Sequence, residues 1–204
     1  MKAIQFLLIL SIAIMSGCKK DHANPEEPDP GGNKQLTDMV PQAYLDEVKK
    51  MGFPIYTGNN PPNISNNYRL APWRFDATKA IESPSNGTPG SINENGFVVS
   101  FSSQKAAAIT VSYEGYYEGF EKQKPFIMGS GNNFTVCRYI GMDACGANFR
   151  YNYVQLLSGT KEGNVLQNVK MATICLGSDN PAATCELAGE ISIHSDADGV
   201  SNPE

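Results

Sequence analysis

The fold of this chain is decided by the stretch Phe97-Val-Val-Ser-Phe-Ser-Ser-Gln-Lys-Ala-Ala-Ala-Ile-Thr-Val-Ser-Tyr-Glu114. Within it, Ile109, Val111 and Tyr113 alternate with polar residues. A period of two is typical of a strand with one buried face. Because a slip of one residue would put all three side chains into water, we expect them to point inward together.

The same period recurs in much of the chain after residue 67. Glycine-rich turns separate the segments, and no helical pattern alternates with them as a parallel sheet would need. We therefore predict a mainly β protein: an antiparallel barrel of about eight strands, with a β-sandwich as the alternative. One alternating set within 149–157 should also face the interior. The other predicted strands cover residues 68–75, 97–102, 134–140, 165–176 and 187–194.

One short amphipathic helix is expected before the strands. Pro41 suits a first helical turn and Gly52 suits the residue after the end. We predict that this helix packs against the barrel or over one of its ends. Its apolar positions, at helical spacing, are Val40, Tyr44, Val48 and Met51.

The first residues resemble a bacterial lipoprotein signal. After Met1-Lys2, an apolar run at 4–15 is too short to span a bilayer as a helix, and it leads to Met15-Ser-Gly-Cys18. The resemblance implies cleavage before Cys18 and attachment of a diacylglycerol to its thiol. An ordinary secretory signal with a chance cysteine is the alternative.

Three regions follow from this pattern. Residues 1–17 are the predicted signal peptide, and residues 18–35 are the lipidated flexible tether. The tether is rich in proline and ends in a Gly31-Gly32 pair, so it lacks the apolar residues of a core. Residues 36–204 are the predicted single β-rich domain.

Charge and motif content exclude several classes of function. The chain has 16 basic and 21 acidic residues, a formal charge of −5, and no basic field for nucleic acid. It has no HExxH, GxSxG or P-loop pattern. We therefore expect a protein that is not an enzyme, needs no cofactor and does not bind nucleic acid.

The cysteine count supports export. Five cysteines are an odd number, and lipid on Cys18 leaves an even set. We predict that these four are oxidised in pairs, although sequence does not choose among their three connectivities. Four buried thiols are one alternative, and a zinc site, for which CxxC spacing is missing, is another. The four disulfide candidates are Cys137, Cys145, Cys175 and Cys185.

Aromatic residues are the candidates for ligand binding. Trp73, Tyr113, Tyr151 and Tyr153 can line a cavity or stack on sugars, whereas packing of the core is the alternative for each of them.

Polar residues near the end of the sequence offer weaker candidates. Asp196 and Asp198 stand before a glycine, as in the start of a calcium loop, but too few further carboxylates follow. We interpret them as a solvated turn and as weak metal candidates only. His194 is expected to be an exposed residue on the polar face of the last strand.

A family resemblance covers the two ends of the domain. Met51-Gly-Phe-Pro-Ile-Tyr-Thr-Gly-Asn-Asn-Pro-Pro-Asn-Ile64, Tyr68, and Ile191-Ser-Ile-His-Ser-Asp-Ala-Asp-Gly-Val200 resemble a group of Bacteroidota outer-membrane lipoproteins of unassigned function. The entry into the first strand is similar to that of the calycins, which include the lipocalins. The resemblance implies a calycin-like barrel and an outer-membrane location, with exposure at the cell surface as a further expectation.

Together these patterns predict a lipid-anchored binding protein of the cell envelope that holds a small apolar or glycan ligand in its barrel. The alternative is a structural lipoprotein that docks an unknown protein partner at the outer membrane and holds no small ligand. A hollow or a filled strand interior separates the two.

Overall fold

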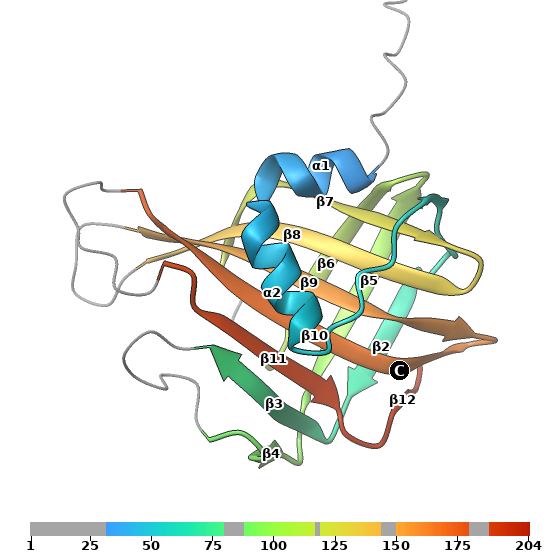
Figure 1. The fold of residues 1–204 in the computed structure, drawn as a ribbon. Helices are drawn as coiled ribbons and strands as arrows, with labels where there is room; N and C mark the ends of the chain where they lie inside the picture. The colour runs from blue at the N-terminus through green and yellow to red at the C-terminus, as the bar shows by residue number, and fades with distance from the viewer. Residues whose placement is uncertain (1–31, 80–87, 117–118, 144–149, 180–187) are drawn as a thin grey trace, which may run out of the picture.

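The computed structural model describes residues 32–79, 88–116, 119–143, 150–179 and 188–204. The strands belong to one sheet in the order β2-β5-β6-β7-β8-β9-β10-β11-β3-β4, and its pairs along this path are antiparallel. The sheet curls on itself (Figure 1). This confirms the predicted antiparallel barrel and excludes the alternative of two packed sheets.

Two helices precede twelve strands in the described residues. The helices are α1 (Gly32–Met39) and α2 (Gln42–Lys50). The strands are β1 (Asn59–Asn60), β2 (Asn66–Leu70), β3 (Trp73–Lys79), β4 (Ile92–Asn93), β5 (Phe97–Lys105), β6 (Ala108–Glu114), β7 (Phe120–Ser130), β8 (Asn133–Asp143), β9 (Arg150–Glu162), β10 (Val165–Ser178), β11 (Ile191–Asp196) and β12 (Val200–Ser201).

These strands group into eight barrel segments within the described residues. β2 and β3 are two halves of one segment, because β5 pairs with the first half and β4 with the second. β11 and β12 likewise both pair with β10. β4 with β5, and each of β6 to β10, supply the other six segments, so consecutive segments are neighbours in an up-and-down arrangement.

The last described residues join the two sides of the curled sheet. β12 pairs with β10, and the residues after it pair with β2: the N–H of Arg69 donates to the carbonyl of Asn202 at 3.1 Å, and that of Glu204 donates to Asn67 at 3.0 Å. On the opposite side the pairing of β6 with β7 is limited to Ala108 and Phe126. Backbone hydrogen bonds from residues 202–204 therefore close the barrel at β2, whereas the pairing between β6 and β7 is short.

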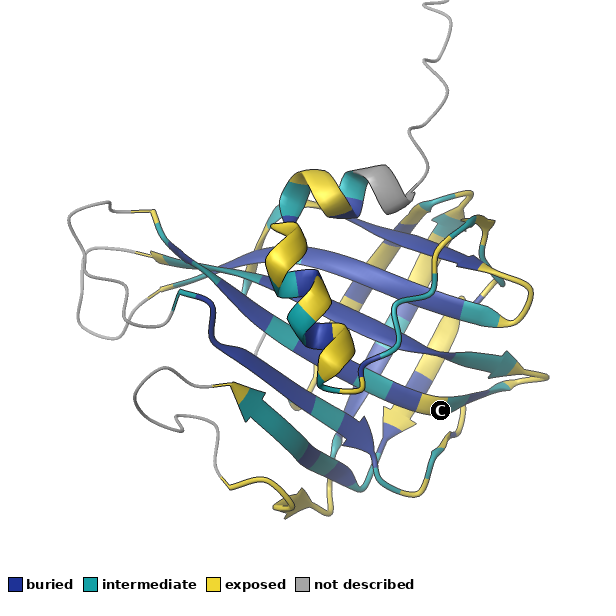
Figure 2. Cartoon of the chain, in the orientation of Figure 1, coloured by how far each residue is buried: buried dark blue, intermediate teal, exposed yellow. Residues whose placement is uncertain are grey.

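The sheet buries apolar side chains on both of its faces. We call the first set the inner cluster and the second, under the helices, the outer cluster (Figure 2). The inner cluster is Ile64, Tyr68, Leu70, Trp73, Phe97, Val99, Phe101, Ile109, Val111, Ile127, Phe134, Val136, Leu157, Leu166, Val169 and Met171. The outer cluster is Leu36, Val40, Leu45, Val48, Phe53, Phe126, Met128, Cys137, Val154, Leu156, Ala172, Ile174, Ile191 and Ile193.

The helical region differs from the single helix that was predicted. Pro41 interrupts it as the N-cap of α2, and a further helix, α1, begins at Gly32 inside the segment expected to be a tether. α2 buries Leu45 and Val48 against the outer face of the sheet and does not close a barrel end. None of the helices in the described residues has the length and apolar character needed to cross a membrane.

The strand register agrees with the predicted faces. Ile109 and Val111 are 4% exposed and belong to the inner cluster, and Tyr113 packs against it. Leu157 belongs to the same cluster. Sequence analysis missed the two-residue strands β1, β4 and β12 and one long strand, β7, where Pro125 and three exposed polar residues before it conceal the period.

Ile109→Ala should destabilise the protein by about 2–5 kcal/mol, because it removes a buried side chain from the inner cluster. The neighbouring Thr110→Ala, on the exposed face of the same strand, should cost less than about 1 kcal/mol. Urea unfolding of both variants measures the difference. Equal losses would contradict the assigned register.

Candidate functional site

The inner face of β8, β9 and β10 changes from apolar to polar toward one end of the barrel. Val136, Leu157 and Met171 are register neighbours and belong to the inner cluster. The next inward row is Arg138, Gln155 and Thr173, also register neighbours. We call this row the polar row, and the barrel end beyond it, where β8 ends, the Asp143 end.

Arg138 is a buried cation in the polar row. It is 3% exposed, and its Nη1 donates to Oε1 of Gln155 at 3.3 Å. Its guanidinium carbon lies 4.7 Å from the ring centroid of Tyr113 on β6. Its Nε has no hydrogen-bond partner, and no carboxylate among the described residues forms an ion pair with it.

Aromatic rings continue from Arg138 across the barrel. The ring centroid of Tyr113 is 5.5 Å from that of Phe97, and Phe97 is 4.9 Å from Trp73. Tyr116 joins the group at 4.7 Å from Phe97 and 5.6 Å from Tyr113. The predicted candidates Trp73 and Tyr113 therefore meet in one aromatic group, linked through Phe97.

His194 extends this group, and the prediction of an exposed residue is wrong. Its ring centroid is 5.9 Å from that of Trp73 and 4.9 Å from that of Phe75, and the Trp73 and His194 planes differ by 3°. Ile191 and Ile193 of the same strand belong to the outer cluster under the helices, so the opposite face, which carries His194, is turned to the barrel interior and not to solvent. Burial lowers the pKa of His194, with partial compensation by Asp76, so the imidazole is neutral near pH 7.

Trp73 and His194 each leave one buried polar atom without a hydrogen-bond partner. These atoms are Nε1 of Trp73 and Nδ1 of His194. Together with Nε of Arg138 they give three such atoms in side chains linked by ring contacts and a cation–π contact. We call Trp73, Phe97, Tyr113, Arg138 and His194 the barrel site.

The tyrosines around the barrel site are neutral hydrogen-bonding groups. Burial is the largest cause of the raised pKa values of both Tyr116 and Tyr153. Tyr116 also hydrogen-bonds with Thr173 of the polar row. Tyr153 is the next residue on the inner face of β9 from Gln155 toward the Asp143 end. Its ring centroid is 6.2 Å from that of Tyr151. The two remaining candidates therefore lie on β9 toward the Asp143 end, beyond the polar row.

The predicted disulfides do not form through the two described cysteines. Cys137 and Cys175 are buried and both carry thiols. Cys137 belongs to the outer cluster, whereas Cys175 hydrogen-bonds with the inward-facing Tyr153, so the two lie on opposite faces of the sheet. Burial raises the pKa of the Cys137 thiol and makes it unreactive. Cys145 and Cys185 lie outside the described residues, as does Cys18.

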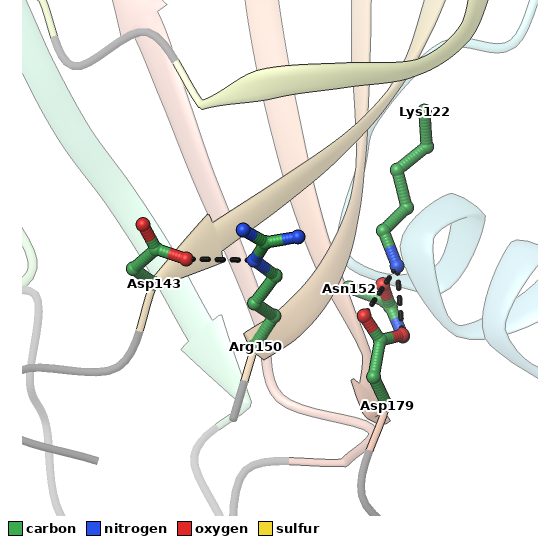
Figure 3. A network of polar contacts seen from close by, with 5 residues as sticks. All are labelled: Lys122, Asp143, Arg150, Asn152 and Asp179. Atoms are coloured by element: carbon green, nitrogen blue, oxygen red, sulfur yellow. Dashed lines mark hydrogen bonds and ion pairs between the residues drawn. The ribbon is translucent and has the colours of Figure 1, made fainter. Parts of the chain in front are cut away.

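Ion pairs join strands near the Asp143 end, in contrast to the isolated charge of Arg138 (Figure 3). Nζ of Lys122 lies 2.7 and 2.8 Å from the two carboxylate oxygens of Asp179, which also accepts from Asn152 at 2.7 Å. Arg150 donates to Asp143 at 2.8 Å. The hydrogen bonds from Lys122 and Asn152 lower the pKa of Asp179, so this carboxylate stays charged.

The weak metal candidates lie in the turn between β11 and β12. Asp198 accepts a hydrogen bond from the N–H of Val200 at 2.9 Å, which is the expected role of a turn residue. Asp196 is not solvated as predicted: it is 4% exposed, and its Oδ2 accepts from Ser201 at 2.5 Å. Burial raises the pKa of Asp196 to about 6. The described residues contain no cluster of three potential metal-ligating side chains.

Sequence analysis missed Arg138, Phe97 and His194 as members of the barrel site. One signal was present for Arg138, a charged residue in the alternating series of Phe134, Val136 and Ile140. Phe97 and His194 belong to the site through ring contacts across the barrel, and these contacts depend on the closure of the sheet.

No protein family, curated protein or solved structure matches the chain.

Asp196→Asn should stabilise the protein at neutral pH, because the folded state then no longer holds this buried negative charge. Folding raises the pKa from 3.8 to about 6, so the penalty of the charge is absent below 3.8 and grows as the pH rises to 6. We expect a melting temperature about 2–8 °C higher near pH 7.5 and no gain at pH 3 to 4. Glu94→Gln, which changes an exposed carboxyl group in the turn after β4, is the control, and equal gains at both pH values would contradict the assignment.

Proposed function

We propose that this chain is a lipid-anchored binding protein of the cell envelope and that it holds a small ligand at the barrel site. The observation that carries the proposal is the set of unpartnered atoms: Nε of Arg138, Nε1 of Trp73 and Nδ1 of His194. Leaving a buried polar group without a partner costs about 1–3 kcal/mol. Such groups gather at sites where a ligand supplies the missing hydrogen bonds.

The composition of the barrel site supports a ligand with flat or apolar surfaces. Trp73, Phe97 and Tyr113 present aromatic surface, and the inner cluster packs next to them. Aromatic rings bind apolar bodies and also the apolar faces of sugar rings, with polar atoms fixing the orientation. The proposed ligand class is therefore a small apolar or glycan molecule.

The membrane anchor of the proposal rests on Cys18. The leader before it is similar to a lipoprotein signal, and residues 19–31 provide a polar, proline-rich spacer between lipid and domain. Two or more acyl chains anchor a protein stably in a bilayer. We propose an outer-membrane location for the anchored protein, with the barrel held off the bilayer by the spacer.

One specific observation favours docking of a protein partner as a second candidate function. A surface groove of about 330 Å³ lies between α1 and β7 and is lined by Asp38, Met39, Gln123, Lys124 and Phe126, among others. Beside it, β7 makes little pairing with β6. A segment of another protein can bind to such a surface without any ligand in the barrel.

An apolar fluorescent probe should bind the full-length chain saturably, at about one probe per chain, if the barrel site takes a ligand. Tyr113→Ala should weaken binding several-fold, because it removes aromatic surface from the site. Tyr44→Ala, which alters a ring packed on the outer cluster, is the matched control. Fluorescence titration measures both. Non-saturable binding would remove the ligand-binding function and favour the docking alternative.

Labelled palmitate should enter the protein in bacterial cells that process lipoproteins, and Cys18→Ala should abolish the labelling. The thiol of Cys18 is the proposed attachment point, and no other residue substitutes for it at the cleavage site. Undiminished labelling in Cys18→Ala would contradict the anchor. Cys137→Ala, which changes a buried thiol of the domain, should be labelled as the unaltered chain is.

A further inference from the structure

We propose that the ligand of the barrel site is a monoanion: an apolar or aromatic body that carries one carboxylate, which binds to Arg138. This inference rests on the proposed ligand-binding function and deepens it by naming the ligand class. Its starting point is the buried charge of Arg138, which contacts a ring and an amide oxygen but forms no ion pair with a carboxylate of the described residues.

A guanidinium keeps its positive charge in proteins. Removing such a charge from water costs several kcal/mol unless an opposite charge and hydrogen bonds compensate it. At 3% exposure, Arg138 has exchanged water for Gln155 and the face of Tyr113, and its Nε has no partner. The tyrosines nearby are neutral, so Arg138 is the one charged side chain among the five residues of the barrel site. The buried carboxyl group of Glu190 lies near Tyr153, beyond the polar row.

The geometry favours a carboxylate as the compensating group. A guanidinium presents a planar fork of donors that matches the two oxygens of a carboxylate. A phosphate monoester fits the same fork, but its second negative charge would need a second cation. His194 is neutral near pH 7 and does not supply it, and Lys122 and Arg150 are already paired with carboxylates near the Asp143 end.

The opposite side of the barrel site indicates a second feature of the ligand. The N–H of Trp73 is a donor without a partner, and the Trp73 ring is stacked with that of His194, whose Nδ1 is also unpartnered. Phe97 and Tyr113 lie between this pair and Arg138 in the chain of ring contacts. A ligand with a carboxylate at one end and a hydroxyl or carbonyl at the other satisfies the polar atoms at both ends of this series.

The test compares three probes of one shape: naphthoate, naphthamide and naphthyl phosphate. Trp73 is the sole tryptophan of the chain, so its fluorescence reports binding at this site without a label. The full-length chain, purified in a zwitterionic detergent, is titrated with each probe against detergent blanks. We expect naphthoate to bind about 10- to 100-fold more tightly than naphthamide, the range of a charge-assisted hydrogen bond.

Two variants assign this preference to Arg138. Arg138→Met keeps the apolar stem and removes the charge, so the ratio between naphthoate and naphthamide should fall to about one. Arg138→Lys keeps the charge and loses the fork, so the ratio should be intermediate. Arg150→Met, which removes a cation paired with Asp143, is the control and should keep the full ratio.

The outcomes separate this inference from the function on which it rests. If none of the probes binds the unaltered chain saturably, the proposed function fails together with the inference. If naphthoate and naphthamide bind equally, the barrel site binds ligands but the carboxylate assignment is wrong. Tighter binding of naphthyl phosphate than of naphthoate would overturn the choice of a monoanion. The unaltered chain decides these cases even if Arg138→Met does not fold.

Discussion

The closure of the sheet along β2 is the constraint on which the rest of the structure depends. Residues 200–204 pair with β10 on one side and with β2 on the other, and Pro203 forms a bridge to Tyr68. Tyr68 is fully buried at this seam, and Lys161 donates to its hydroxyl at 2.9 Å. Without the seam, the inner faces of β2 and β10 would not enclose a common interior.

Closure of the sheet also explains why the interior can hold the charged side chain of Arg138, whose burial is energetically unfavourable. Apolar rows from Phe134 to Met171 fill the part of the barrel below the polar row and stabilise the fold through burial. The helices add a second apolar layer on the outer face. With stability supplied by these two layers, Arg138 can remain buried without an anionic partner. Strained or unsatisfied groups of this kind persist where the surrounding structure holds them in place.

Much of the architecture was predictable from sequence, because it follows from a period of two. The inward faces of Ile109, Val111 and Leu157 agree with the register of β6 and β9. The position of β7 was not predictable, since Pro125 and its polar neighbours mask the alternation. The helix boundary at Gly32 was missed because prolines and glycines before it indicate an irregular segment.

The barrel site was less predictable than the fold. Trp73 and Tyr113 were candidates by residue type alone, but their link through Phe97 depends on contacts across the barrel. His194 was misplaced because both faces of β11 are buried: Ile191 and Ile193 pack in the outer cluster, so the polar face of the strand lies toward the barrel interior. Disulfide pairing was inferred from an even number of cysteines. That number does not show on which face of the sheet each thiol lies, and Cys137 and Cys175 lie on opposite faces.

The central claim is that a ligand completes the unpartnered polar atoms of the barrel site. The indole N–H signal of Trp73, unique in the chain, tests it most directly in proton–nitrogen correlation spectra. On titration with a lipid and metabolite extract of the cell envelope, the account predicts a saturable shift of this signal, because its free donor gains an acceptor or a changed ring environment. An indole signal that stays in place at every concentration of extract would contradict the account.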